Sequence, residues 1–124
     1  MEMKIKFDIK EVEEMLAEFN LEPGGKVQQA IDGAVADFCI PYCPYRTGKL
    51  AHSPYSSTLF GSGVIEYGVP YASYMYYGVI NGKEVHYNTA INPLAGSYWD
   101  RRMKADRMGD IVAVAKKAMS KHGV

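Results

Sequence analysis

Two segments with helical periodicity flank a middle segment, residues 41–98, in which Tyr, Ser, Gly and Pro dominate. This division constrains the fold more than any other feature. The first helical segment, residues 26–40, carries apolar side chains on one face and ends at Pro41, which cannot continue a helix. The second, residues 97–120, begins with Ser97 and Asp100 as a plausible capping pair. Its apolar face is formed by Met108, Ile111, Val112, Ala115 and Met119.

Shorter patterns predict the remaining elements. Residues 3–7 alternate between apolar and charged side chains, which is typical of a strand, and Asp8 then caps a helix over residues 9–19. In the middle segment, residues 55–60 and 64–67 are strand-like, with Gly61-Ser62-Gly63 as a hairpin turn between them.

The second half of the middle segment is less regular. Residues 70–78 favour a short helix, and Asn81-Gly82 is a two-residue turn within a β-arm or loop over residues 79–96. The whole pattern predicts an α+β fold: a small antiparallel sheet with helices packed on one face and a long C-terminal helix. We expect residues 1–124 to form a single domain.

Charge is distributed unevenly along a chain whose net charge is zero. Residues 1–40 carry four Lys against nine Asp and Glu, whereas residues 97–124 carry seven Lys and Arg against three Asp. An acidic start and a basic end favour head-to-tail contact between copies, although a monomer with a dipolar surface is an equal interpretation. No apolar run is long enough to span a membrane, and no signal peptide is evident, so we expect synthesis in the cytoplasm.

No residue pattern indicates catalysis. Cys39 and Cys43, with His52 nearby, provide too few ligands for zinc and fit buried cysteines better. Gly48-Lys49 lacks the glycine and the hydroxyl of a phosphate loop. We therefore expect no catalytic residue, no metal and no cofactor, and predict that the protein is not an enzyme.

Ten tyrosines are the strongest compositional bias. Tyrosine suits protein interfaces and also stacks on nucleic-acid bases, but the Tyr-rich region has few cations, which favours an interface. For Tyr67 and Tyr71, packing in the core of a small sheet is a substantial alternative. A basic cluster, Arg101, Arg102, Lys104 and Arg107, leaves a nucleic-acid-binding module as the alternative function, unless pairs such as Asp106–Arg102 neutralise it.

Three motifs in order carry a resemblance to a known family. The first is Pro44-x-x-Thr47-Gly48-x-Leu50-x-x-Ser53, after a long helix. The second is Pro70-Tyr71-Ala72-x-Tyr74-x-Tyr76-Tyr77-Gly78, and the third runs from Asn92-Pro93 through Trp99 to Asp106. Together they resemble phage minor capsid and head–tail connector (tail completion) proteins, most closely those of phages and prophages of Gram-positive bacteria. Asp100-Arg101 after Trp99 departs from the family pattern.

The resemblance implies a structural virion protein, synthesised in the host bacterial cytoplasm, that forms a homo-oligomeric ring and docks on portal, connector or tail proteins. Weak contact with DNA passing through the ring remains open, and no membrane role is implied. We expect Thr47, Gly48, Leu50, Tyr71 and Trp99 to maintain the fold. The expected assembly contacts are Tyr74, Tyr76, Tyr77, Asn81, Gly82 and Tyr87.

Overall fold

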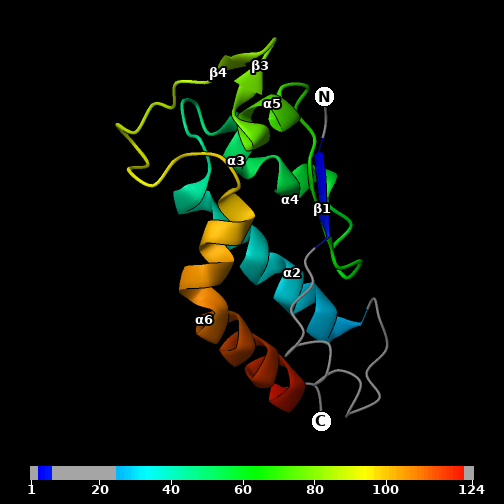
Figure 1. Ribbon diagram of the computed structural model, residues 1–124. Coiled ribbons are helices and arrows are strands. Elements are labelled where there is room, and N and C mark those ends of the chain that lie inside the picture. Colours follow the sequence, from blue (N-terminus) through cyan, green and yellow to red (C-terminus); the bar gives the residue numbers. More distant parts are fainter. Residues whose placement is uncertain (1–2, 7–24, 122–124) are drawn as a thin grey trace.

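The computed structural model describes residues 3–6 and 25–121; the predicted helix over residues 9–19 and its Asp8 cap lie outside these ranges. Two long helices, α2 (Lys26–Cys39) and α6 (Trp99–Lys121), form the body of the described structure. They lie side by side and run in opposite directions, with the shorter elements gathered at one end of the pair (Figure 1). Both predicted helices are therefore confirmed.

The apolar stripes predicted for the two long helices form the centre of the core. Val27, Ile31 and Val35 of α2 are buried, as are Ile111 and Ala115 of α6. After Cys39 the chain tightens into a single 3-10 turn, η1 (Ile40–Tyr42), which contains Pro41. The proline thus ends the α-helix where the sequence predicts, because it has no backbone N–H to donate.

The start of α6 differs slightly from the prediction. The helix begins at Trp99 rather than at residue 97 because Tyr98 has a φ of 50°, which lies outside the helical region. The predicted Ser97–Asp100 capping pair is therefore wrong. Instead, the Asp100 carboxylate accepts a hydrogen bond from the hydroxyl of Tyr76, and the carbonyl of Ser97 accepts one from Arg102.

The first sheet pairs the N-terminal strand with a strand of the middle segment. Strand β1 (Met3–Lys6) pairs antiparallel with β2 (Val64–Tyr67), so that Met3 lies opposite Tyr67. Side chains alternate along β2, with Ile65 and Tyr67 buried. Both strands are confirmed, but the partner of β2 is the N-terminal strand.

The predicted strand over residues 55–60 is wrong. Two single turns of helix, α3 (Lys49–His52) and α4 (Pro54–Ser57), occupy this region, with Pro54 at the first position of α4, which suits proline. After α4, the Thr58 hydroxyl bonds to the backbone of Glu66 in place of a strand ladder. Consequently, Gly61-Ser62-Gly63 leads into β2 without forming the predicted hairpin turn.

The second sheet is a minimal hairpin that follows a short helix. Helix α5 (Ala72–Tyr77) ends at Gly78, whose φ is 76°, and β3 (Val79–Ile80) pairs with β4 (Lys83–Glu84). Asn81 and Gly82 have φ values of 50° and 77°, the left-handed conformation that a tight two-residue turn requires. The short helix and the turn are confirmed, and with two antiparallel sheets beside the helices the α+β class is confirmed as well.

Candidate assembly surface

The tyrosines of α5 divide between the core and the surface. Tyr76 is only 4% exposed; its ring packs edge-on against Trp99, with 5.0 Å between centroids, and its hydroxyl donates to Asp100 at 2.5 Å. Tyr74 and Tyr77 lie on the outside, 41% and 54% exposed. The structure thus separates the predicted contact residues of this helix: Tyr76 is an interior residue, whereas Tyr74 and Tyr77 face solvent.

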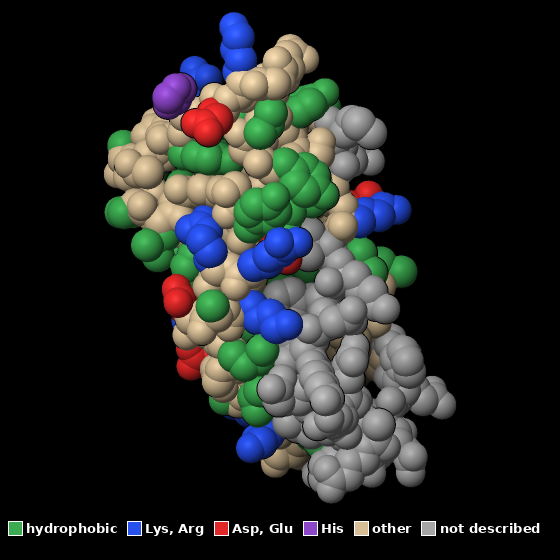
Figure 2. Space-filling view, in the orientation of Figure 1, with side chains coloured by type: hydrophobic (Ala, Val, Ile, Leu, Met, Phe, Trp, Pro, Cys, Tyr) green, Lys and Arg blue, Asp and Glu red, His purple; other side chains and the backbone are tan. Residues whose placement is uncertain are grey.

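Two more exposed apolar residues follow α5 in the hairpin. Val79 and Ile80 directly follow the helix and are also exposed. We call Tyr74, Tyr77, Val79 and Ile80 the α5–β3 patch. Figure 2 shows hydrophobic side chains gathered over this end of the molecule. Val79 and Ile80 lie within residues 79–96 but were not among the named contact residues, although an apolar pair directly before Asn-Gly is the available signal for an exposed hairpin strand.

We call residues 79–96, which comprise the hairpin and the chain that follows it, the arm. Hydrogen bonds hold the arm to the body at several points. The Tyr87 hydroxyl donates to the carbonyl of Met75 at 2.7 Å and lies close to Gly78, where an added Cβ would be 2.8 Å from it. The side-chain amide of Asn92 donates to the carbonyls of Ile40 and Cys43. Tyr87 therefore holds the arm, whereas Asn81 and Gly82 stand exposed at its tip.

The residues of the first motif shape a turn beside α3. Gly48 has a φ of 86°, a conformation that favours glycine, and a Cβ there would lie 2.6 Å from the hydroxyl of Tyr45, so any other residue would also displace the Tyr45 side chain. The Thr47 hydroxyl accepts the backbone N–H of Lys49 at 3.4 Å, and Leu50 is buried. These placements agree with fold-keeping roles.

The other two predicted fold residues lie in different environments. Trp99 is fully buried and packs edge-on against Tyr67 as well as Tyr76. Tyr71, by contrast, is 40% exposed at the start of α5, where it lines a pocket.

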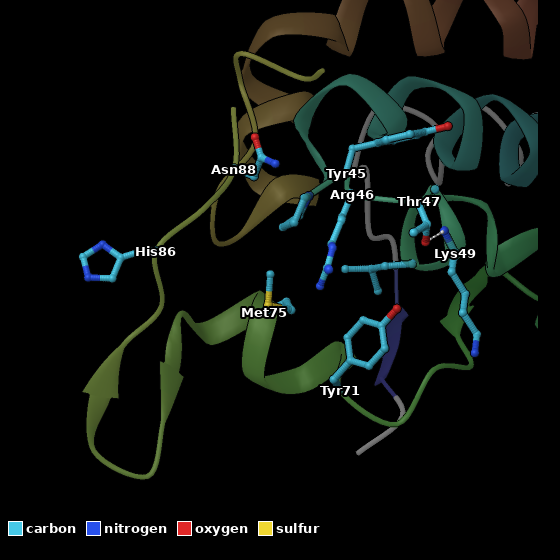
Figure 3. A pocket seen from close by; sticks show the side chains of 11 residues that line it. Tyr45, Arg46, Thr47, Lys49, Tyr71, Met75, His86 and Asn88 are labelled. Atoms are coloured by element: carbon cyan, nitrogen blue, oxygen red, sulfur yellow. Dashed lines mark hydrogen bonds between the residues drawn. The ribbon is translucent and has the colours of Figure 1, made fainter. Parts of the chain in front are cut away.

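This pocket has a volume of about 510 Å³ and lies between residues 44–50, α5 and the arm. Tyr71 and Met75 line one side, and His86 and Asn88 line the arm side. Figure 3 shows Arg46 reaching from residues 44–50 toward Met75 and Tyr71, with His86 at the far edge. We call it the Arg46 pocket; no sequence pattern pointed to it, because three separate segments form it.

The cysteines behave as buried thiols. Burial raises the pKa of Cys39 to about 12 and raises that of Cys43 further. Both thiols are therefore protonated at neutral pH, which leaves little thiolate to act as a nucleophile or metal ligand. Among the described residues, no three His, Cys, Asp or Glu side chains gather into a metal site, and none of the described helices is long and apolar enough to cross a membrane.

The basic cluster of α6 is largely engaged within the protein. Arg102 donates to the backbone carbonyls of Tyr42, Leu94 and Ser97, and Arg107 bonds to Asp110. The predicted Asp106–Arg102 pair is replaced, since Asp106 accepts from the Tyr42 hydroxyl at 2.7 Å.

The other exposed cations of α6 are spread along the helix. Lys116, Lys117 and Lys121 lie about three turns or more beyond Lys104. Binding of DNA through this helix receives no specific support from the arrangement.

Comparison with known proteins agrees with the motif order. A family model described as minor capsid protein matches residues 3–119, which is nearly the whole chain. Searches of curated proteins and of solved structures returned no match. The match extends across both long helices, the motifs between them and β1. The chain therefore belongs to the minor capsid protein family, and its role is structural, in the phage virion.

Proposed function

We propose that this protein is a head–tail connector or tail completion subunit, which assembles into a homo-oligomeric ring and docks on portal or tail proteins at the neck. The observation that supports this is the α5–β3 patch. It places two tyrosines and two β-branched apolar side chains on the outside of the subunit. Clusters of exposed aromatic and apolar groups are typical of surfaces that are covered by a partner.

The arm adds shape to this surface. The tip at Asn81 and Gly82 projects beyond the body, while Tyr87 and Asn92 fix the base of the arm (Figure 1). Because hydrogen bonds already hold the base of the arm, the arm loses little conformational entropy when it binds a partner. The proposed action is docking and involves no catalysed reaction.

The test is incorporation into particles. Tyr77→Ser combined with Ile80→Asp removes apolar area and places a charge in the α5–β3 patch. We expect phage that carry this variant to release particles with at least tenfold less of the protein, measured by mass spectrometry of purified virions. Leu59→Ser is the matched control, because Leu59 is 78% exposed but belongs to a different segment.

Two outcomes contradict the proposal. Wild-type particles without the protein would exclude a place at the neck. Normal incorporation of the double variant, with its fold intact by circular dichroism, would show that the patch is not the docking surface.

A further inference from the structure

The Arg46 pocket combines an apolar floor with positive charge. Pro44 and Leu50 are buried beneath it and Met75 is half-buried, while Arg46 and Lys49 are exposed at its edge. None of its lining residues is Asp or Glu. A matching ligand therefore carries carboxylates next to apolar side chains, since carboxylates pair with Arg and Lys while apolar groups bury against the floor.

The chain itself contains such a segment. Residues 7–24 include six Asp and Glu against one Lys, interspersed with large apolar side chains. The acidic residues are Asp8, Glu11, Glu13, Glu14, Glu18 and Glu22. This segment accounts for most of the negative charge of the N-terminal third, and its chemistry complements that of the pocket.

The elements on either side of this segment, β1 and α2, show where its two ends lie. Lys6, the last residue of β1, lies opposite Val64, and the side chain of Gln28 in the first turns of α2 lies close to Gly63. Both ends of residues 7–24 therefore emerge beside residues 63–64, at the N-terminal end of α2.

The pocket lies beyond the other end of α2. The helix has 14 residues and is about 21 Å long. A segment of 18 residues that is fixed at both ends reaches about 30 Å at most, and only when fully extended in both directions. A pocket on the same chain is thus reached only when most of the segment is extended, whereas the pocket of a neighbouring copy carries no such requirement.

We propose that the Arg46 pocket binds the acidic segment, residues 7–24, of a second copy of this chain. The proposal deepens the proposed function, on which it rests, by naming a contact of the ring. The contact is heterologous, because donor and acceptor are different surfaces at opposite ends of α2. Repetition of such a contact generates a ring when the rotation closes.

Direct binding is measured with a fluorescently labelled synthetic peptide of residues 7–24 and the full-length protein. We expect saturable binding that weakens as salt increases, because exposed charge pairs are screened. Arg46→Glu with Lys49→Glu is expected to weaken binding at least tenfold. Lys116→Glu with Lys117→Glu, which makes the same charge change on the exposed face of α6, is expected to change it less than twofold.

A charge exchange separates contact between copies from binding within one chain. One variant carries Arg46→Glu and Lys49→Glu; the other carries Glu13→Lys, Glu14→Lys and Glu18→Lys. We expect each variant alone to sediment as a monomer, and an equimolar mixture to associate, because each acidic surface then meets a basic one. The mixture also controls for folding, since misfolded variants would not recover association.

The inference is overturned if the peptide does not bind, if the pocket variant binds it like wild type, or if the mixture remains monomeric. A monomeric mixture with normal peptide binding would indicate that the segment occupies the pocket of its own chain. These outcomes are distinct from failure of the proposed function, which is decided by virion incorporation and the α5–β3 patch variants.

Discussion

The carboxylate of Asp32, in the middle of α2, accepts the backbone N–H of Gly61 at 2.7 Å, and the same oxygen accepts that of Gly63 at 3.0 Å. Asp32 is almost completely buried, and its other oxygen accepts from the amide of Gln28. This carboxylate holds the turn that leads into β2 against the long helix. It therefore fixes the start of the strand on which β1 pairs.

Replacing Asp32 with Ala is expected to destabilise the protein by about 3 kcal/mol, because two N–H groups, one of them fully buried, lose a charged acceptor. Urea denaturation followed by circular dichroism measures the change. Asp110→Ala is the control, because Asp110 is exposed and pairs with Arg107 on the surface, where an ion pair contributes about 1 kcal/mol or less. Equal unfolding midpoints for the two variants would contradict the assigned role of Asp32.

Two glycines are expected to respond in opposite directions to the same substitution. Gly48→Ala places a side chain at a φ of 86° and against Tyr45, so we expect a loss of about 1–2 kcal/mol. Gly109→Ala, within α6 and with open space around the added methyl, is expected to stabilise the protein by up to about 1 kcal/mol. Thermal denaturation of both variants checks the signs; stabilisation by Gly48→Ala would refute the tight-turn interpretation.

Arg102→Lys is expected to destabilise the protein by about 1–3 kcal/mol while keeping its charge. The planar guanidinium reaches three carbonyls on two segments, those of Leu94 and Ser97 just before the helix and that of Tyr42, and an ammonium group on a flexible stem cannot reproduce that geometry. Arg101→Lys, on the exposed side of the same helix turn, is expected to change stability by less than about 0.5 kcal/mol. Chemical denaturation of the pair measures this difference, and similar losses for both would argue against a special role for Arg102.

Alkaline pH is expected to weaken the fold. Burial raises the pKa of Cys39 from 9.0 to about 12, and it also raises the pKa of Cys43 and of Tyr67. Below pH about 9 these groups are neutral in both states, so their contribution to stability is fully present. As pH rises further, the two thiols and the Tyr67 hydroxyl ionise at a lower pH in the unfolded chain than in the folded protein. The free energy of unfolding therefore falls.

Urea midpoints at pH 7, 9 and 11 measure this decrease. A Cys39→Ala, Cys43→Ala variant should show a shallower slope above pH 9, because two of the shifted groups are gone. A midpoint that does not change between pH 7 and 11 would show that these groups do not remain neutral in the folded protein.

The parts of the fold that were predicted correctly depend on local patterns. Apolar spacing defines α2 and α6 because each helix buries one stripe, and Asn81-Gly82 defines its turn because the required backbone angles suit these residues. The error at residues 55–60 arose because a strand-like run before Gly61-Ser62-Gly63 suggested a hairpin. There, Pro54 and the side-chain bonds of Thr58 to Glu66 determine the local structure instead.

The candidate site was only partly accessible to sequence reasoning. Tyr74, Tyr76 and Tyr77 form one run of similar residues, and only the orientation of α5 against Trp99 shows which of them points inward. The roles of Asp32 and Arg102 could not be recognised, because key partners, the N–H groups of Gly61 and Gly63 and the carbonyl of Tyr42, are backbone groups distant in sequence. The Arg46 pocket depends on the same kind of distant packing.

The way the arm is fastened also determines which substitutions the subunit tolerates. Its anchors are few: the backbone of Val85 bonded to Gly78, the hydroxyl of Tyr87, the amide of Asn92 and the carbonyl of Leu94 held by Arg102. The outward side chains between these anchors contribute little to the core. Substitution of these side chains can therefore reshape the outer surface of the arm while the helices beneath keep their packing.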